Sequence, residues 1–230
     1  MPKARTKRFP RGSTRERILA AAEGLFAEAG LDGVSFRDLA GCAGVSLSAT
    51  HYHFGSKHAL LDEILTRGSH AVTEARAASL KMALAQHVPS LEAVIEAFLR
   101  PALDATRSES GEAFNRLHAR LAVERGQVTR QLLGVCFGAN DELFLKALAQ
   151  LLPDLPLEDL RWRFHFLVGA MIQATSDSGR FLGLSGGPGS PADTPRALDA
   201  LVKGFAALFR APSADGETGG RNAFSVLASL

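Results

Sequence analysis

A chain of 230 residues with 46% hydrophobic residues has enough apolar material to bury a core. Its formal net charge is only +2, but the charge is distributed unevenly along the chain. Up to Arg17 there are seven basic residues and one acid, Glu16, whereas from Leu61 onward 17 basic residues face 19 acidic ones. The basic end predicts a segment that meets phosphates, and a solvated, disordered leader is the alternative interpretation.

Cysteine usage and hydropathy exclude several classes of protein. Cys42 and Cys136 lie far apart and fit no metal-binding spacing, so both are expected to be reduced thiols. The basic N-terminus has no apolar stretch behind it, so we do not expect it to be a signal peptide. The most apolar later stretch, residues 164–174, is too short to span a bilayer. We therefore expect a soluble, cytoplasmic protein with no membrane association and no cofactor.

Apolar residues recur at helical spacing, and no stretch shows the sustained alternation that is typical of strands. The sequence therefore predicts an all-α fold, punctuated by Pro89, Gly111, Gly126, Pro153 and Pro156. The expected helices cover residues 14–29, 36–43, 47–54, 57–85, 90–106, 112–124, 128–152, 157–182 and 194–209. Three other segments are expected to lack regular structure: a basic disordered arm (1–12), a loop rich in Gly, Pro and Ser (184–195) and a flexible tail (211–230).

Two short expected helices, 36–43 and 47–54, meet at a turn that contains Gly44. This arrangement predicts a helix-turn-helix, in which the second helix enters the major groove of DNA. Val45, Thr50 and Phe54 suit the face that anchors the second helix. The remaining residues of that helix are left for DNA, namely Leu47, Ser48, Ala49, His51, Tyr52 and His53.

The run from Val45 to Leu61, with Tyr-His-Phe-Gly-Ser-Lys at residues 52–57, resembles the recognition helix and following junction of the TetR family of bacterial repressors. The likeness covers residues 15–65. It implies a three-helix DNA-binding domain at 13–57, with the helix-turn-helix motif at 35–54. It also implies a larger helical domain at 58–210 for effector binding and dimerisation.

The resemblance assigns DNA contacts to Arg37, Leu47, Ser48, Ala49, His51, Tyr52, His53 and Lys57. A guanidinium at Arg37 can pair bidentately with guanine or bind a phosphate, and Leu47 and Ala49 can touch a thymine methyl. Ser48 can donate to a base or a phosphate. Lys57 opens the next helix, where its ammonium and the helix N-terminus both favour phosphate.

His51, Tyr52 and His53 are expected to lie along the DNA backbone, with some assignments open. The family often has tyrosine at the position of His51, so either His51 or Tyr52 takes the phosphate. A packing role for Tyr52 is the alternative. A metal site formed by His51, His53 and His58 is a rival interpretation. No cysteine or carboxylate completes such a site, so we expect no bound metal.

A single short recognition helix reads few bases, so we expect two copies on adjacent major grooves of a palindromic operator. By resemblance, the last two long helices pair with their symmetry mates. Their candidate dimer contacts are Phe164, Val168, Met171, Ile172, Leu201 and Phe205. The alternative is that either apolar stripe faces the core of its own protomer.

The middle helices are expected to enclose an effector pocket. Its candidate lining residues are Phe98, Leu99, Leu103, Phe114, Leu117, His118, Leu121, Phe144, Trp162 and His165, and a plain core position is the alternative for most of them. An apolar lining suits an acyl chain, because each buried methylene contributes about 0.8 kcal/mol. The stretch 157–169 is also similar to family members that respond to fatty acids or acyl-thioesters.

The resemblance implies a DNA-binding transcriptional regulator, specifically a homodimeric repressor that a small apolar effector releases from double-stranded DNA. The long helix at 57–85 runs from the DNA-binding residues to the effector pocket, so we expect it to transmit the effect of ligand binding. An activator of the same family is an alternative, because the position of the operator decides whether binding represses or activates transcription. A helical enzyme is the rival interpretation. The sequence contains no phosphate-binding glycine loop, no nucleophile elbow and no metal-binding spacing that would support it. The near-neutral total charge counts against a non-specific architectural DNA binder.

Overall fold

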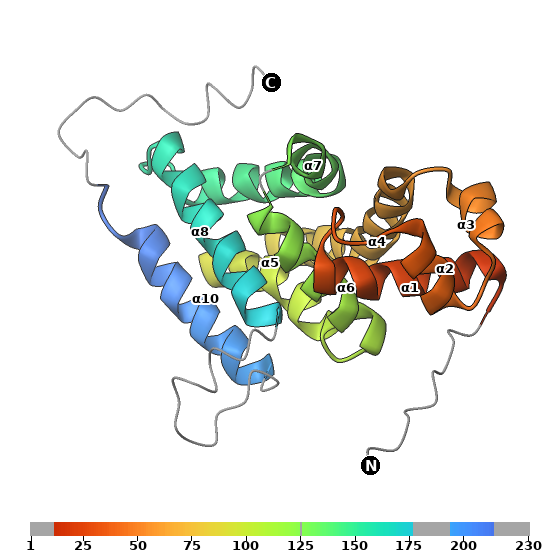
Figure 1. Ribbon diagram of the computed structural model, residues 1–230. Helices are drawn as coiled ribbons and strands as arrows, with labels where there is room; N and C mark the ends of the chain where they lie inside the picture. The colour runs from red at the N-terminus through yellow and green to blue at the C-terminus, as the bar shows by residue number, and fades with distance from the viewer. Residues whose placement is uncertain (1–11, 125, 177–193, 214–230) are drawn as a thin grey trace, which may run out of the picture.

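The computed structural model describes residues 12–124, 126–176 and 194–213, and all regular structure within these ranges is helical (Figure 1). The all-α prediction is confirmed for this part of the chain. The helices are α1 (Thr14–Ala29), α2 (Phe36–Ala43), α3 (Leu47–Phe54), α4 (Lys57–Leu84), α5 (Leu91–Ala105), α6 (Glu109–Val123), α7 (Gln127–Leu151), α8 (Leu157–Thr175) and α10 (Thr194–Arg210).

Most helix starts depend on a serine cap. The side-chain oxygen of an N-cap serine accepts a hydrogen bond from a backbone N–H that the first turn leaves without an intrahelical partner. Ser13 and Ser35 form reciprocal capping boxes with Glu16 and Asp38, respectively. Four further serines cap α3, α4, α5 and α6, namely Ser46, Ser56, Ser90 and Ser108. Local sequence therefore fixes where these helices begin.

Two of the expected boundaries differ from the structure by more than one residue. Gly111, expected to be a break, lies in the first turn of α6, because the Ser108 side chain caps that helix earlier. A Cβ at Gly111 would lie 2.2 Å from the carbonyl oxygen of Ala105, so the glycine serves close packing instead. The helix at 157–182 ends at Thr175, with Ser176 as its C-cap. Its expected continuation, and nearly all of the expected arm, loop and tail, fall on 1–11, 177–193 and 214–230, outside the described residues.

The buried apolar residues form two clusters. The head core joins α1, α2, α3 and the first half of α4, and it extends onto α6 and α7 through Phe114, Leu117, Leu121 and Phe137. The body core joins the second half of α4 with α5, α7, α8 and α10. The expected three-helix domain is therefore not packed as a separate unit, because α6 and α7 complete its core.

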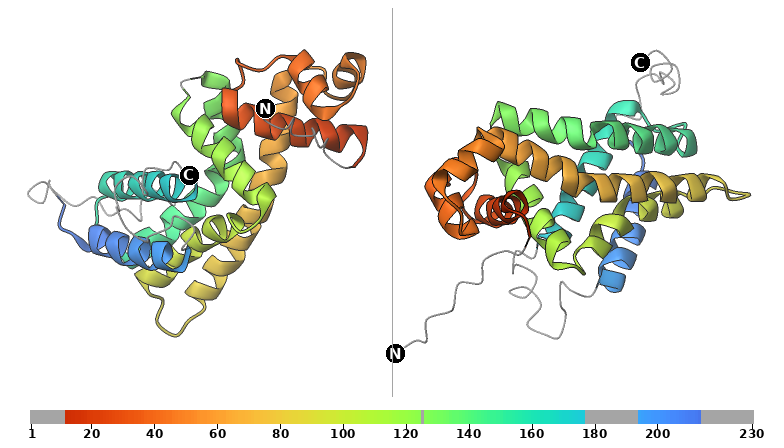
Figure 2. Two further views of the ribbon diagram at one scale, coloured as in Figure 1. Left: turned by 60° about the horizontal axis from the view of Figure 1, so that its bottom comes forward. Right: turned by 90° about the vertical axis from the view of Figure 1, so that its right-hand side faces the viewer.

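Helix α4 passes from one core into the other without interruption, as the right-hand view of Figure 2 shows. Its buried residues Leu60, Leu61 and Leu65 belong to the head core, and Leu80 and Ala83 belong to the body core. A single continuous helix thus ties the position of α3 to the body.

A buried arginine lies where α4 crosses the body. Arg76 is 2% exposed, its Nε donates to the carbonyl oxygen of Phe98 at 2.8 Å, and its guanidinium carbon lies 3.9 Å from the centre of the Phe98 ring. Burial lowers the pKa of Arg76 to about 10, although the charge of Asp141 opposes the shift. Burial raises the pKa of Asp141 to about 6, which the charge of Arg76 limits. One terminal nitrogen of Arg76 also lies 2.8 Å from Met171 Sδ, so the guanidinium has carbonyl, ring and sulfur contacts.

A second arginine joins α8 to the end of α10. One terminal nitrogen of Arg163 donates to the carbonyl oxygens of Leu208, Phe209 and Ala211 at 2.7–3.0 Å. A cation at a helix C-terminus satisfies carbonyls that have no intrahelical partner and complements the helix dipole. The two helices, side by side at the end remote from α3 in Figure 1, are thereby fixed to each other.

Replacing Gly68 with alanine tests the contact between α4 and α6. A Cβ at Gly68 would lie 2.0 Å from the Phe114 ring, whereas a Cβ at Gly24 in α1 would have nothing within 4 Å. We expect Gly68→Ala to lower the free energy of unfolding by about 1–3 kcal/mol through overpacking. Gly24→Ala should raise it by about 0.5–1 kcal/mol through helix propensity. Urea denaturation measures both, and equal stabilisation by the two variants would disprove the close contact.

Candidate nucleic-acid interface

The turn between α2 and α3 is held by backbone and side-chain contacts. Gly44 adopts the left-handed conformation (φ 65°, ψ 39°), which favours glycine. A terminal nitrogen of Arg17, in α1, donates to the Gly44 carbonyl oxygen at 2.7 Å. The Thr50 side chain is completely buried, and its hydroxyl donates to the carbonyl oxygen of Ser46 at 3.3 Å. Thr50 and Phe54, expected as anchors, are confirmed on the buried face of α3.

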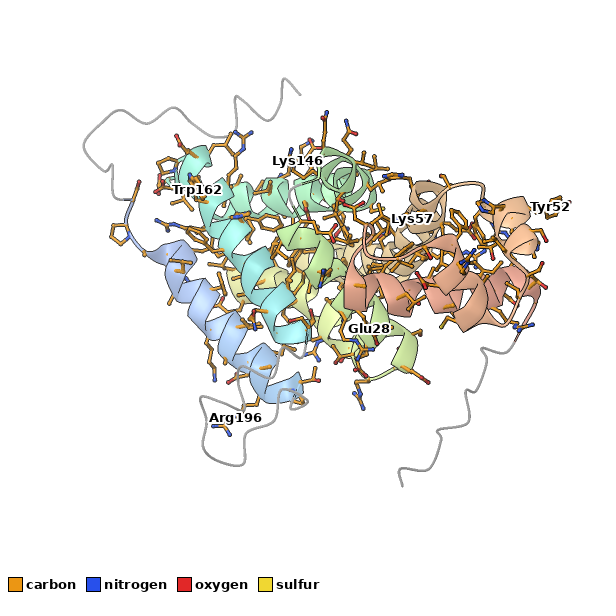
Figure 3. All side chains as sticks on the ribbon, viewed as in Figure 1. Glu28, Tyr52, Lys57, Lys146, Trp162 and Arg196 are labelled. Atoms are coloured by element: carbon orange, nitrogen blue, oxygen red, sulfur yellow. The ribbon has the colours of Figure 1, made fainter. Side chains whose placement is uncertain are left out.

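The opposite face of α3 is open to solvent. Tyr52 is 86% exposed and projects outward from the end of the molecule, as Figure 3 shows. Leu47 and Ser48 are exposed at the start of α3, and Arg37 is exposed at the start of α2. Ala49 is half-buried. Leu47, Ser48 and Tyr52 thus leave one side of α3 open to solvent, which suits a helix that enters a groove.

The two aromatic candidates for a phosphate contact have different surroundings. The His51 ring stacks on the Phe36 ring, with centroids 4.3 Å apart and planes 20° apart. Among the described residues, the ring contact of Tyr52 is with the edge of the half-buried His53 ring, at 5.4 Å between centroids. The phenol of Tyr52 is therefore free to move toward a ligand, whereas His51 is committed to a stacking contact.

Lys57 has a structural contact that its sequence position does not reveal. Its Nζ donates to the carbonyl oxygen of Leu31 at 2.7 Å, and the side chain is half-buried. Figure 3 places Lys57 nearer the body than Tyr52. An ammonium has three N–H donors, so this bond leaves two for another acceptor.

An ionic contact braces α1 against α4. Arg15 binds Glu63 through both terminal nitrogens, and Arg67 binds the same carboxylate at 2.7 Å. The guanidinium of Arg15 also lies 5.1 Å from the centre of the Phe54 ring, at the end of α3. Sequence reasoning missed this brace and the Arg17 contact, because each joins residues far apart in the chain. The basic character of 15–17 was the only signal.

The expected effector-pocket residues do not surround one cavity. Phe98 and Phe144 pack edge to face in the body core at 5.1 Å between centroids, and Leu99 and Leu103 lie in that core too. Phe114, Leu117 and Leu121 belong to the head core. The alternative of plain core positions is thus the better description of six of these residues, whereas Phe114 also lines a groove.

Three other pocket candidates also need correction. Trp162 is 55% exposed and His165 is exposed, because these residues occupy the face of α8 opposite its buried residues. His118 is sandwiched between the rings of Phe114 and Phe137, with centroids at 6.2 and 4.7 Å. Burial lowers the pKa of His118 to about 4, and the charge of Arg76 adds to the shift. His118 is therefore a neutral packing residue at neutral pH.

A groove of about 730 Å³ lies where α1 meets α4, α5 and α6. Of the expected pocket residues only Phe114 lines it. The other lining residues include Leu19, Glu23, Val72 and Asp104. Sequence reasoning missed this groove, because its walls come from four helices and combine small, charged and apolar residues without a single periodic stripe.

The expected dimer residues divide into two sets. Phe164 and Met171 face the body core of their own protomer, so they are not available to a partner on this surface. The physical reason is that the buried stripe of α8 includes both of them. Val168, Ile172, Leu201 and Phe205 are partly buried against the same core. The large apolar side chains left exposed on α8 and α10 are Trp162, Phe166 and Leu208.

Neither metal sites nor membrane spans are found in the described ranges. No group of three or more His, Cys, Asp or Glu side chains there is arranged to hold a metal ion. None of the described helices is both long and apolar enough to cross a membrane.

Comparison with curated proteins gives one short but close match. Over 51 residues the chain is 43% identical to the HTH-type transcriptional repressor KstR2 of Rhodococcus jostii (strain RHA1). This alignment covers 22% of the chain and only a quarter of the length of that relative.

Solved structures share the whole fold at low identity. A TetR-family transcriptional regulator from Bordetella parapertussis 12822 superposes with a TM-score of 0.61 and 19% identity, covering 83% of this chain and 95% of the other. The ketosteroid transcriptional regulator KstR2 of Mycobacterium tuberculosis gives 0.59 and 18%, covering 86% and 98%. The TetR-family regulator PfmR from Thermus thermophilus gives 0.57 and 20%, covering 88% and 99%. At these identities the likeness is one of fold.

Family models match both parts of the chain. Residues 18–64 match the model for bacterial regulatory proteins of the tetR family, and residues 96–207 match the tetracyclin repressor-like C-terminal domain. Together the two matches cover more than half of the sequence and include both the helix-turn-helix and the body. The chain belongs to the TetR family of bacterial regulatory proteins.

Proposed function

We propose that the protein is a DNA-binding transcriptional repressor that acts as a homodimer on a palindromic operator and is released by a small ligand. The observation that carries this proposal is the outward face of α3, rigidly mounted through Thr50, Phe54 and the Arg17–Gly44 contact. A recognition helix must hold its orientation while its outer side chains remain free, and α3 meets both conditions.

The contacts available on this face divide into base reading and phosphate binding. Leu47 and Ser48 are exposed at the start of α3, the second helix of the motif, which meets base edges, and Arg37 is exposed at the start of α2. Tyr52 is the favoured phosphate ligand over His51, since its hydroxyl is free and the His51 ring is stacked. Lys57 adds a positive charge at the start of α4, where helix N–H groups also favour an anion.

Replacing Lys57 with alanine tests the placement of the phosphate contact. We expect Lys57→Ala to weaken binding to operator and scrambled DNA alike, and to lower the slope of log affinity against log salt by about one. Arg37→Ala should weaken operator binding and relax base preference if Arg37 reads a base. Fluorescence anisotropy at several salt concentrations, with DNA from upstream of the protein's own gene, measures both effects.

The control for charge alone is Lys146→Ala on α7, which lies far from α3 in Figure 3 and pairs with Glu142 at 2.9 Å. It should leave operator affinity unchanged. Operator affinity that is unaltered in both Lys57→Ala and Arg37→Ala would refute the assigned DNA face. Equal affinity of the unaltered protein for scrambled DNA would refute a specific repressor.

The exposed apolar face of α8 and α10 is the proposed dimer interface. Trp162 and Phe166 are one turn apart and more than half exposed, and Leu208 is exposed on the neighbouring helix. Arg163 fixes the two helices to each other, so the pair presents one surface. Large aromatic side chains are typical of interface centres. A dimer that reads adjacent major grooves must hold its two recognition helices about 34–36 Å, or a multiple of it, apart.

A double substitution of the aromatic pair tests the interface. We expect Trp162→Asp with Phe166→Asp to shift the protein to a monomer in sedimentation velocity, because it places two charges in an apolar contact. Operator affinity should fall at least about tenfold as only one half-site is read. Val135→Asp, on the exposed surface of α7, is the control and should remain dimeric. A dimer that persists in the double variant would exclude this face.

The chemical class of the effector is less constrained than its size. A groove of about 730 Å³ falls within the range of small-molecule sites. A fatty acid or acyl-thioester remains the proposal made from the resemblance of 157–169. The groove itself does not favour a fatty acid, because Glu23 and Asp104 would repel its carboxylate. The buried Arg76 could receive such a carboxylate only if Phe98 and Met171 moved away.

A further inference from the structure

The groove lined by α1, α4, α5 and α6 is named the junction groove. It lies between α1, which packs against the helix-turn-helix, and the helices α5 and α6. Leu19 and Glu23 line it from α1, and Ile64 and Val72 line it from α4. Phe114 of α6 closes one side, with its ring against the backbone of α4 at Gly68. Any molecule bound in this groove would touch both α1 of the DNA-binding domain and the helices α5 and α6.

Most charged side chains of the junction groove are already paired. Arg67 binds Glu63 at 2.7 Å, and Arg100 binds Glu96. The Glu16 carboxylate accepts the backbone N–H of Ser13 at 2.8 Å. These contacts give both lining arginines and one lining acid a partner within the protein, so these groups depend less on a ligand than an unpaired charge does.

Two lining carboxylates remain, Glu23 and Asp104. Neither has a hydrogen bond or ion pair from its side chain to any of the described residues. Glu23 is half-buried on the α1 wall, and burial alone raises the pKa of its carboxyl, with no cation near enough to oppose the shift. A partly desolvated carboxylate without a partner is stabilised by any cation that the groove admits.

We propose that the junction groove binds a small amphiphilic organic cation, with its apolar body against Leu19, Val72 and Phe114 and its charged nitrogen beside Glu23. The groove volume of about 730 Å³ suits an organic molecule. The two free carboxylates repel an anion. A bare metal ion is disfavoured, because the described residues include no cluster of three metal-ligating side chains.

Binding at this place has a consequence for DNA, which rests on the proposed function. The ligand contacts α1 and α4 together. It therefore favours one arrangement of the DNA-binding helices α1–α3 relative to the rest of the protein. It changes operator affinity only to the extent that it binds the two arrangements unequally. We expect the cation to favour the arrangement that holds DNA poorly and so to weaken operator binding.

Titration calorimetry with three probes of equal chain length tests the site: decyltrimethylammonium, decanoate and decanol, each below its micelle concentration. The cation should bind once per protomer and at least about tenfold more tightly than either other probe. Glu23→Gln, which keeps the side-chain shape, should remove this preference. Glu28→Gln is the matched control on the exposed side of α1, seen in Figure 3, and should bind like the unaltered protein.

A second variant separates the groove from the charge. Ala71 is exposed and lines the groove from α4, so Ala71→Trp should fill it and abolish binding of the cation without changing the melting temperature much. Equal affinity for the three probes, or unchanged binding in Glu23→Gln, would overturn the proposed site. A cation that still binds fully to Ala71→Trp would overturn its location.

Operator binding of the same samples, with and without the cation, distinguishes the two proposals. An absence of operator binding without any probe would overturn the repressor function and leave the cation site standing. Operator binding that is identical with saturating cation would overturn the coupling alone. A Glu23-dependent loss of operator affinity supports both.

Discussion

The continuity of α4 is the constraint on which the arrangement of this molecule depends. A helix of 28 residues is about 42 Å long, and its backbone hydrogen bonds prevent it from bending freely. Its first turns complete the head core, and its last turns lie in the body core. A change in the tilt of α4 must therefore displace α3 or repack one of the cores. The Arg15–Glu63–Arg67 brace stiffens the same junction from the side of α1.

The signals that were readable from the sequence are local ones. Serine caps, the left-handed Gly44 and apolar periodicity depend on neighbours within a few residues, and they placed α1, α2 and α3 at the predicted bounds. Periodicity shows that a helix has an apolar face but not which neighbour covers it. Phe164 and Met171 were therefore predicted at a dimer contact although they face the body core, and Trp162 was predicted in a pocket although it is exposed.

The candidate site was predictable to the extent that it lies on one short segment. The outward residues of α3 follow from their alternation with Thr50 and Phe54 around the helix. The contacts of Lys57 with Leu31 and of Arg17 with Gly44 join residues 26 and 27 positions apart, so they emerge only when the chain is folded. The junction groove requires four helices at once, which no periodic pattern encodes. Side-chain identity thus indicated the candidate DNA face, and tertiary structure supplied its support.

The way the buried residues divide into two cores determines where a ligand must bind to affect α3. Had α6 packed only in the body, a ligand would need to act on α3 through the whole length of α4. Instead Phe114, Leu117 and Leu121 of α6 lie in the core that holds α1–α3, and Gly68 lets the Phe114 ring rest directly on α4. Because closely packed cores shift between discrete arrangements rather than yielding gradually, a displacement of α6 requires α1 to move with it or the head core to repack. A ligand at the junction therefore needs no path through the body core to change the orientation of the recognition helix.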